Sequence, residues 1–252
     1  MRNKADEYPD DYDKRGIGTE GVQAVADAVA LVQACRPYSV IEGRDPLVLS
    51  TMLSFYAKPG ARVLDVTANS RRMWQGVAWG SPVTYADIDP ATNPDVVADF
   101  RALPFDPASF DVIVFDPPQL PAAAASAQSS KQMVRDYGLA HAPHADNISA
   151  YFPPFLAEAH RVLRPDGLVF AKLKDFVHNH QYQWTLADFV AAVRAQHGLT
   201  ACDLIVKRDP SGGALKSSKW QKAHHVRNAH CWWIVVRKGR CEARTAGGTD
   251  GC

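Results

Sequence analysis

The sequence predicts a single α/β domain whose mostly parallel β-sheet is covered by helices on both faces. Short apolar runs rich in β-branched residues alternate along the chain with stretches of helical periodicity, as such a fold requires. The clearest run, residues 112–115, is bounded by Asp111 on one side and by Asp116-Pro117-Pro118 on the other. Because the prolines end both strand pairing and any helix, we expect this run to be a buried parallel strand. The length of 252 residues suits one domain that buries its own core.

Local patterns place the other elements. Apolar residues recur at helical spacing in several stretches, and Asp45-Pro46 supplies an N-cap and a first-turn proline for one of them. The expected helices are 19–34, 45–58, 155–163 and 185–197. The expected strands are 62–66, 83–87, one ending at Asp99, 112–115, 168–175, 199–206 and 231–237. The domain therefore spans 19–240, between a charged, mobile arm at 1–18 and a disordered tail at 241–252.

Two segments inside the domain are too long and irregular to be simple connections. Residues 119–150 are first small and polar and then lack clear periodicity, which indicates a lid over the target, with a solvated loop as the alternative. Residues 207–230 carry six Lys and Arg residues and a tryptophan, which suits a nucleic-acid backbone with a base to stack upon, although a solvated basic hairpin is the other interpretation. The expected substrate contacts are Tyr137 in the first segment and Lys219, Trp220, Lys222 and Arg227 in the second.

Charge is distributed unevenly along the chain. The formal net charge of the whole sequence is only +1. Residues 161–240, however, contain 14 Lys and Arg against 5 Asp and Glu, a local charge of +9 that leaves the remainder net acidic. The basic end is therefore the candidate surface for a polyanion such as nucleic acid.

Cysteine usage and hydropathy predict a cytoplasmic protein. The five cysteines form no CxxC pair and are odd in number, which argues against a disulfide framework and a zinc site and favours a reduced compartment. The amino terminus lacks the apolar core of a signal peptide, and no run approaches the ~18 apolar residues of a membrane span, so we expect no membrane partner. His178 and His180 raise the idea of a metal site, but they lack a third ligand at suitable spacing, so we expect none.

Four acidic residues each end a predicted strand: Asp65, Asp87, Asp99 and Asp116. In open α/β sheets, ligands bind at the edge where parallel strands end. The carboxylate of Asp116 only accepts hydrogen bonds when ionised, and the prolines after it offer carbonyls but no N–H. The carboxyl end of this strand, at Asp116, is therefore suited to bind a group rich in N–H donors, such as an exocyclic amine. The alternative is a strand-ending turn without chemistry.

Four stretches of the chain carry a family resemblance. They are ADFRALPF, FDPPQL, RVLRPDGLVFAK and HCWWIVVRK, and the resemblance covers roughly residues 45–238. The chain resembles the class I S-adenosylmethionine (AdoMet) methyltransferases with an Asp/Asn-Pro-Pro-aromatic signature that methylate amino nitrogens, and more narrowly a group of small phage- and mobile-element-type enzymes. The resemblance implies a Rossmann-like fold, with a seven-stranded, mostly parallel sheet, one antiparallel strand and helices on both faces. It also implies AdoMet as cofactor.

The resemblance implies methyl transfer to an exocyclic amino nitrogen, adenine N6 or cytosine N4, with DNA favoured. Asp116 and the Pro117 carbonyl would accept the two N–H bonds of the amine, and Pro118 and Gln119 complete the signature. A base inside a duplex is inaccessible, so it must be flipped out or single-stranded. Gln119 stands where the signature usually has an aromatic residue, and this departure keeps RNA, protein glutamine and small amines open as substrates.

The resemblance also implies a cofactor site. The expected contacts are Asp65, Thr67, Asn69 and Ser70 in the first loop, Asp87 (with Asp89 as the alternative) at the ribose, and Asp99 and Phe100 at the adenine. The family pattern in the first loop is Asp-x-Gly-x-Gly, and here the glycines are missing, although a hydrogen-bonded turn is still expected. A non-catalytic nucleic-acid-binding module with the same fold is therefore the second hypothesis. Arg71 is expected to pair with a carboxylate such as that of the cofactor's methionine moiety, with a surface arginine as the alternative, and Lys172 with substrate phosphate or with Asp175.

Overall fold

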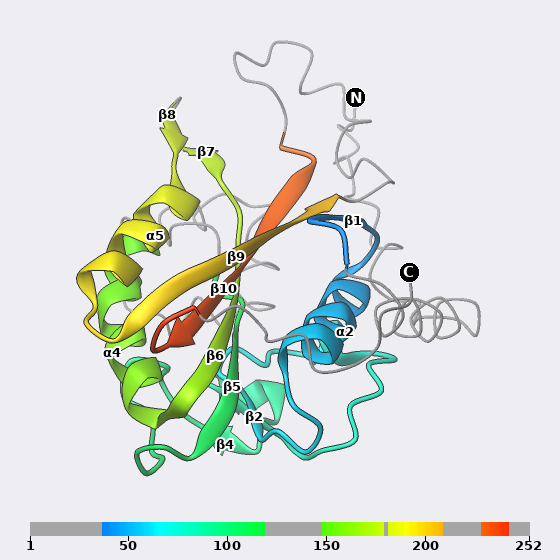
Figure 1. The fold of residues 1–252 in the computed structure, drawn as a ribbon, viewed down its shortest axis with the longest axis vertical. Coiled ribbons are helices and arrows are strands. Elements are labelled where there is room, and N and C mark those ends of the chain that lie inside the picture. Colours follow the sequence, from blue (N-terminus) through cyan, green and yellow to red (C-terminus); the bar gives the residue numbers. More distant parts are fainter. Residues whose placement is uncertain (1–36, 119–147, 179–180, 209–227, 242–252) are drawn as a thin grey trace, which may run out of the picture.

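The computed structural model describes residues 37–118, 148–178, 181–208 and 228–241 (Figure 1). The strands of the main sheet are β1 (Val40–Glu42), β2 (Val63–Asp65), β3 (Val83–Asp87), β4 (Val96–Val97), β5 (Phe110–Phe115), β6 (Leu163–Leu173), β9 (Leu199–Arg208) and β10 (His230–Lys238). Their order across the sheet is β1-β9-β10-β6-β5-β2-β3-β4. Strand β10 runs antiparallel to both of its neighbours, and the other pairs are parallel. The strands β7 (Phe176–His178) and β8 (Gln181–Gln183) form a separate antiparallel hairpin.

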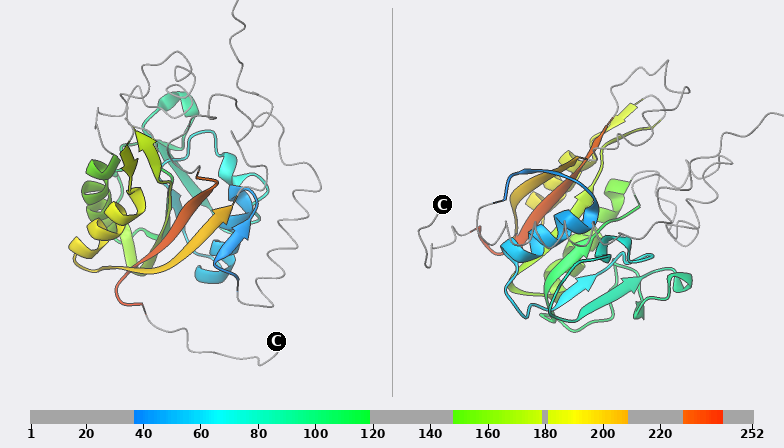
Figure 2. Two further views of the ribbon diagram at one scale, coloured as in Figure 1. Left: turned by 90° about the horizontal axis from the view of Figure 1, so that it is seen from above. Right: turned by 90° about the vertical axis from the view of Figure 1, so that its right-hand side faces the viewer.

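Helices cover both faces of the sheet (Figures 1 and 2). They are α2 (Asp45–Tyr56), α4 (Phe152–Val162) and α5 (Thr185–Ala195), with short 3-10 helices at η2 (Arg72–Trp74), η3 (Pro90–Thr92) and η6 (Ile148–Tyr151). Helix α2 packs on one face, and α4 and α5 pack on the other. None of the described helices is long and apolar enough to cross a membrane.

The central strand β5 shows why the apolar runs fold as they do. Ile113 and Phe115 belong to the core beneath α4 and α5, whereas Val112 and Val114 belong to the core beneath α2. Successive side chains of a strand point to opposite faces, so a strand buried on both sides needs a continuous apolar run. The ring of Phe115 stacks on Phe155 of α4 with centroids 3.7 Å apart, which fixes that helix to the strand.

The observed sheet confirms the predicted α/β class, the mostly parallel pairing and the single antiparallel strand. The structure adds an eighth strand, β1, which pairs in parallel with β9. It also starts β6 at Leu163, earlier than the expected 168, because Leu163 already pairs with Phe110, and an irregular turn at Asp166 (φ 62°) and Gly167 separates this pair from the next one, Leu168 with Val112. A Cβ on Gly167 would lie 2.9 Å from the carbonyl oxygen of Arg164, so this close approach requires glycine.

Several sequence predictions lie outside the described residues. They concern the arm at 1–18, the helix at 19–34, the lid as far as residue 147, most of the basic loop and the tail from residue 242.

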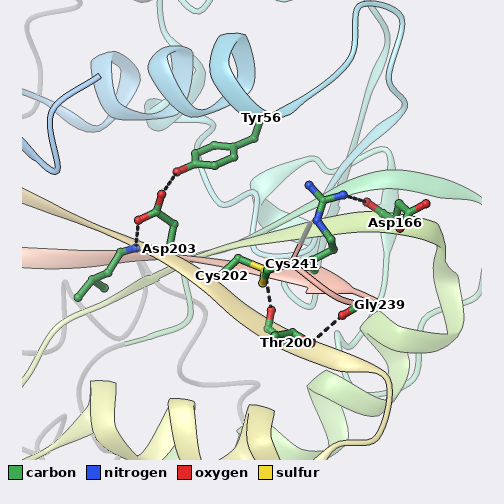
Figure 3. Close-up of a disulfide and its surroundings, with 9 residues drawn as sticks. Tyr56, Asp166, Thr200, Cys202, Asp203, Gly239 and Cys241 are labelled. Atoms are coloured by element: carbon green, nitrogen blue, oxygen red, sulfur yellow. Dashed lines mark hydrogen bonds between the residues drawn. A yellow bond between two sulfur atoms is a disulfide. The ribbon is translucent and has the colours of Figure 1, made fainter. Parts of the chain in front are cut away.

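One prediction from cysteine usage is wrong. Cys202 of β9 and Cys241, which follows β10, form a disulfide with their Cα atoms 5.7 Å apart (Figure 3). The two residues are 39 positions apart, so no short spacing reveals the pair, and only the antiparallel neighbours β9 and β10 bring them together. The argument from cysteine usage for a reduced compartment therefore loses its support. Cys231 is a free, buried thiol.

Reduction of the Cys202–Cys241 disulfide is expected to lower the free energy of unfolding by about 2–4 kcal/mol, because the bond closes a loop of roughly 40 residues in the unfolded chain. Urea unfolding with and without dithiothreitol measures this difference. The control is a double variant, Cys202→Ser with Cys241→Ser, whose unfolding should not respond to the reductant. Identical unfolding curves of the wild-type protein in both conditions would contradict the expected contribution.

Candidate functional site

Four carboxylates stand in a row along one edge of the sheet. Asp65 ends β2, Asp87 ends β3, Asp116 follows β5, and Asp99 lies just beyond β4. Since β4, β3, β2 and β5 are consecutive neighbours and mutually parallel, their carboxyl ends meet at the same edge. The structure therefore brings together the four acidic residues that the sequence singled out.

Asp65 lies beneath the first loop and holds its backbone. Its side chain is fully buried. One carboxylate oxygen accepts the backbone N–H of Thr67 at 3.0 Å, and the other accepts the indole N–H of Trp74 at 2.7 Å. Burial raises the pKa of Asp65 to about 7, although both hydrogen bonds oppose the rise. Both oxygens are thus engaged within the chain, in a position that shapes the loop.

This buried acid predicts a pH dependence of stability. The pKa of Asp65 in the folded state, about 7, exceeds its ordinary value of 3.8, so the folded protein retains a proton that the unfolded chain releases. Stability is therefore expected to fall as the pH rises from about 4 to 7, by about 1 kcal/mol per pH unit. Urea unfolding at pH 5, 6 and 7 measures the slope. In Asp65→Asn the slope should flatten, and an unchanged slope would show that another group causes it.

The turn after Asp65 forms without glycine. Asn69 adopts a left-handed conformation (φ 43°), which asparagine tolerates better than most residues. The N–H of Asn69 donates to Asp87 at 2.7 Å, and the N–H of Ser70 donates to the side-chain oxygen of Asn69 at 2.5 Å. The expected hydrogen-bonded turn at Thr67, Asn69 and Ser70 is confirmed. Its amides bond to side chains of the chain itself.

Asp87 has the chemistry that a ribose requires. Its oxygens accept the N–H groups of Asn69 and Asp89, at 2.7 and 2.9 Å. Each ionised oxygen offers about two acceptor positions, so each retains one for a hydroxyl group. Asp89, the alternative, caps the 3-10 helix η3 by accepting the N–H of Ala91 at 2.8 Å. Asp87 therefore fits a ribose diol better than Asp89 does.

Asp99 and Phe100 occupy different environments. Both carboxylate oxygens of Asp99 are held by the guanidinium of Arg101, whose hydrogen bonds lower the pKa of Asp99. An adenine amino group would reach Asp99 only by displacing Arg101. Phe100 packs edge-on against Phe115, with centroids 5.2 Å apart, and presents a partly buried apolar surface. The fit to a nucleoside therefore rests on Asp87 and Phe100 more than on Asp99.

Arg71 pairs with a carboxylate of the chain itself, and not with one of a cofactor. Its guanidinium pairs with Asp95 at 3.1 Å and lies over the ring of Tyr85, 4.2 Å from the centroid. These two contacts explain why an arginine stands in this turn, and the explanation requires no bound ligand.

Asp116 is joined both to the loop and to a cluster of charges. Its backbone N–H donates to the hydroxyl oxygen of Thr67 at 2.8 Å. Its Oδ2 accepts Lys172 Nζ at 2.9 Å. The same ammonium lies 2.9 Å from Asp45, and Lys207 pairs with the other oxygen of Asp45 at 3.0 Å. Four charges thus converge from α2, β6, β9 and the tip of β5, and we call these residues the charge cluster.

Sequence reasoning missed the charge cluster. Asp45 was expected to be an N-cap, but Arg44 holds that position and the Asp45 carboxylate pairs with the lysines instead. Lys172 was expected to meet substrate phosphate or Asp175, but its side chain, only 18% exposed, lies between Asp116 and Asp45. One signal was available: a lysine within the apolar run of β6 requires a buried partner.

The two carboxylates of the charge cluster differ in acidity. Burial favours the neutral form of Asp45, but Lys172 and Lys207 outweigh it and lower its pKa to about 2. Burial raises the pKa of Asp116, and the charge of Asp45 adds to this against the attraction of Lys172. Burial alone would lower the pKa of Lys172, but the two carboxylates raise it well above its usual value. Asp45 is therefore a permanent anion, whereas Asp116 takes up a proton more readily.

The other predicted site residues are only partly described. Pro117 is buried and Pro118 partly buried beside Asp116. The predicted contacts outside the described residues are Gln119, Tyr137, Lys219, Trp220, Lys222 and Arg227. Within the described part of the chain, no three His, Cys, Asp or Glu side chains are grouped as metal ligands.

Comparisons with known proteins give similar folds only. No family model and no curated protein matches the chain. Among solved structures, TrmN from Thermus thermophilus has a TM-score of 0.47 at 18% identity over 84% of this chain and 52% of its own, so the chain spans about half its length. The 1,6-didemethyltoxoflavin-N1-methyltransferase of Burkholderia thailandensis, solved with S-adenosylhomocysteine, has a TM-score of 0.49 at 17% identity over 88% and 87%. The [4+2]-cyclase SpnF has a TM-score of 0.49 at 12% identity over 86% and 93%. At these identities and TM-scores, an activity has to be argued from the site.

Proposed function

We propose that this protein is an AdoMet-dependent methyltransferase that transfers a methyl group to an exocyclic amino nitrogen of a nucleic-acid base, adenine N6 or cytosine N4, with DNA favoured. One observation carries the proposal. The Asp116-Pro117-Pro118 tip lies against the loop after β2, through the hydrogen bond from Asp116 to Thr67. The candidate amine acceptor and the candidate cofactor loop are therefore neighbours.

The state of the Asp116 carboxylate supports the same proposal. Lys172 holds Oδ2, while Oδ1 accepts no hydrogen bond from the described residues, and the side chain is 20% exposed. A carboxylate fixed through Oδ2 can orient an incoming amine through Oδ1. Pro117 and Pro118 have no N–H to compete for that oxygen.

The residues around the loop fit the cofactor. Asp87 would accept the ribose hydroxyls and Phe100 would flank the adenine, next to the turn at Thr67, Asn69 and Ser70. When bound, AdoMet supplies an electrophilic methyl group on its sulfonium.

The chain's own residues would prepare the amine. The nitrogen of an exocyclic amine is a poor nucleophile because its lone pair is delocalised into the ring. Asp116 Oδ1 accepts one N–H and the Pro117 carbonyl accepts the other, which directs the lone pair out of the ring plane. The nitrogen must lose a proton when it gains the methyl group, and the raised pKa of Asp116 makes this carboxylate the proton acceptor. Lys172 keeps the carboxylate in place through Oδ2.

Two measurements test the proposal in sequence. Isothermal titration calorimetry should detect AdoMet binding to the purified protein. Tritiated methyl transfer to separate DNA, RNA and protein pools should then label DNA, and nucleoside mass spectrometry should identify N6-methyladenine or N4-methylcytosine. If only RNA, protein or a small amine is labelled, that class and not DNA is the substrate. Gln119, which stands at the aromatic position of the signature, is the feature that favours such a substrate.

A non-catalytic nucleic-acid-binding module is the second candidate. The observation that favours it is the loop itself, in which the N–H groups of Thr67 and Asn69 donate to Asp65 and Asp87 and are not available to a cofactor. Absence of heat on titration with AdoMet, together with retained nucleic-acid binding, would favour the module over the enzyme.

Substrate affinity is expected to fall steeply with salt. The net positive stretch 161–240 would neutralise phosphates and release counterions on binding, although its Lys172 and Lys207 are already paired with Asp45 in the charge cluster. If about three phosphates are neutralised, a fourfold rise in salt weakens binding by about 40-fold. Fluorescence anisotropy of a labelled oligonucleotide at several salt concentrations measures the slope. A flat dependence would point to a small-molecule substrate.

A further inference from the structure

The β7–β8 hairpin and the residue after it carry an aromatic pair, of which Trp184 is exposed and Tyr182 is partly buried. The rings of Tyr182 and Trp184 lie in contact, with centroids 4.6 Å apart and planes inclined by 53°. The Trp184 residue is 64% exposed, and Val177 on the facing strand of the hairpin is 41% exposed. A tryptophan that is mostly in contact with water is unusual in a folded domain, and clustered exposed apolar groups mark binding sites.

The hairpin that carries this pair is fastened to the sheet by one buried acid. Asp175, 5% exposed, accepts the backbone N–H of Leu186 on one carboxylate oxygen and the indole N–H of Trp232 on the other, at 3.0 and 3.1 Å. Its carbonyl accepts the side-chain amide of Asn228 at 2.7 Å. These bonds fix the start of β7, the start of α5 and the approach to β10 at one point.

Both residues of the aromatic pair are fixed by neighbouring hydrogen bonds. The hydroxyl of Tyr182 and the side-chain amide of Asn228 are hydrogen-bonded at 3.0 Å. Trp184 immediately precedes α5, whose first turn is fixed by the bond from Leu186 to Asp175. A ring held in place loses little conformational entropy when a ligand stacks on it.

The hairpin lies at the same edge of the sheet as Asp116. Lys172, near the end of β6, binds Asp116, and Asp175 anchors the hairpin just beyond that strand. Figure 1 shows β7 and β8 extending beyond the sheet on the side where β6 ends. The aromatic pair therefore lies beyond the same edge of the sheet at which the amine of a substrate would meet Asp116.

The proposed substrate indicates the kind of ligand. The pair lies within residues 161–240, whose sequence has a formal charge of +9, although Lys172 and Lys207 of this stretch are ion-paired with Asp45. Asn228, which is bonded to Tyr182, is also where the lysine- and arginine-rich segment 207–230 rejoins the described chain. An exposed aromatic ring is suited to stacking on an unpaired base of the proposed nucleic-acid substrate, because every base has a face that can stack.

We propose that the Tyr182–Trp184 pair is a stacking surface for an unpaired base that flanks the target in a single-stranded stretch of nucleic acid. The inference rests on the proposed function for its nucleic-acid substrate, and it adds a binding site separate from the Asp116 tip.

The test is a binding measurement that needs no methyl transfer. Fluorescence anisotropy would compare labelled single-stranded DNA and RNA of about 12 nucleotides with an abasic DNA of the same length. We expect Trp184→Ala to weaken binding of the base-bearing strands by about 5- to 150-fold and to leave the abasic strand unaffected. Trp184→Phe, which retains a stacking ring, should recover most of the affinity. Tyr38→Ala removes another exposed aromatic side chain, 84% exposed and just before the edge strand β1, and should bind like the wild type.

Two results would overturn the inference: wild-type affinity in Trp184→Ala, or equal binding of abasic and base-bearing strands by the wild-type protein. A parallel methyl-transfer assay separates this inference from the proposed function. Methylation of nucleic acid with binding that does not depend on Trp184 rejects the stacking surface alone. Binding that depends on Trp184, without any methyl transfer, supports the stacking surface and rejects the enzymatic role alone.

Discussion

Replacement of Asp116 by alanine is expected to lower kcat for methyl transfer by about 100- to 10,000-fold, the range for loss of a group that handles a proton in the transition state. The variant loses both the oxygen that orients the amine and the group that takes its proton. AdoMet affinity should stay nearly unchanged, because the cofactor would be held by Asp87 and the loop after β2. Tritiated methyl transfer gives kcat, and calorimetry gives the cofactor affinity.

Two further variants sharpen this test. Asp116→Asn retains an acceptor oxygen but cannot take up a proton, so its kcat should also fall while substrate binding is kept. Asp111→Asn changes the carboxylate at the opposite end of β5, which binds the N–H of Arg62 and the side chain of Arg164. It should lose stability but keep its kcat. An Asp116→Ala enzyme that methylates at the wild-type rate would remove Asp116 from the mechanism.

The sequence predicted the fold well because the signals for its elements are local. The apolar run of β5 indicates burial on both faces, and Asp116-Pro117 marks its end, whatever the rest of the chain does. The turn at Asn69 could also be expected, since a residue that tolerates left-handed geometry stands where glycine was missing. Strand β1 was missed because three residues at the sheet edge, mostly exposed, have no apolar pattern of their own.

The contacts that the sequence could not give depend on strand order and register. Lys172 and Asp45 are 127 residues apart, and they meet only because α2 packs on the face of the sheet that Lys172 reaches. Lys207 lies two strands away from Lys172, with β10 between them, so its part in the charge cluster follows from the pairing of β6, β10 and β9. The Cys202–Cys241 disulfide depends on the same neighbours. None of these distances is encoded in a short spacing.

Replacement of Lys172 by methionine is expected to lower the free energy of unfolding by about 3–5 kcal/mol, the usual result of removing one partner from a buried ion pair. Methionine has a similar shape, so packing in β6 should change little. Asp116 would lose its cation, and Asp45 would keep only Lys207. Because Lys172 lowers the pKa of Asp116, its removal should raise that pKa further, and the pH at which kcat reaches half its maximum should rise with it. Urea unfolding and a pH profile of methyl transfer measure the two effects.

The neighbouring residue Lys174 provides the matched control. It is exposed on the same strand extension, so Lys174→Met should change the free energy of unfolding by no more than about 0.5 kcal/mol. Adding Asp45→Asn to Lys172→Met removes one of the two carboxylates left behind, and should recover part of the lost stability if the charges are coupled. If Lys172→Met is as stable as Lys174→Met, or if the two substitutions are simply additive, the lysine does not hold the carboxylates. The positioning of Asp116 would then have to come from its bond to Thr67 alone.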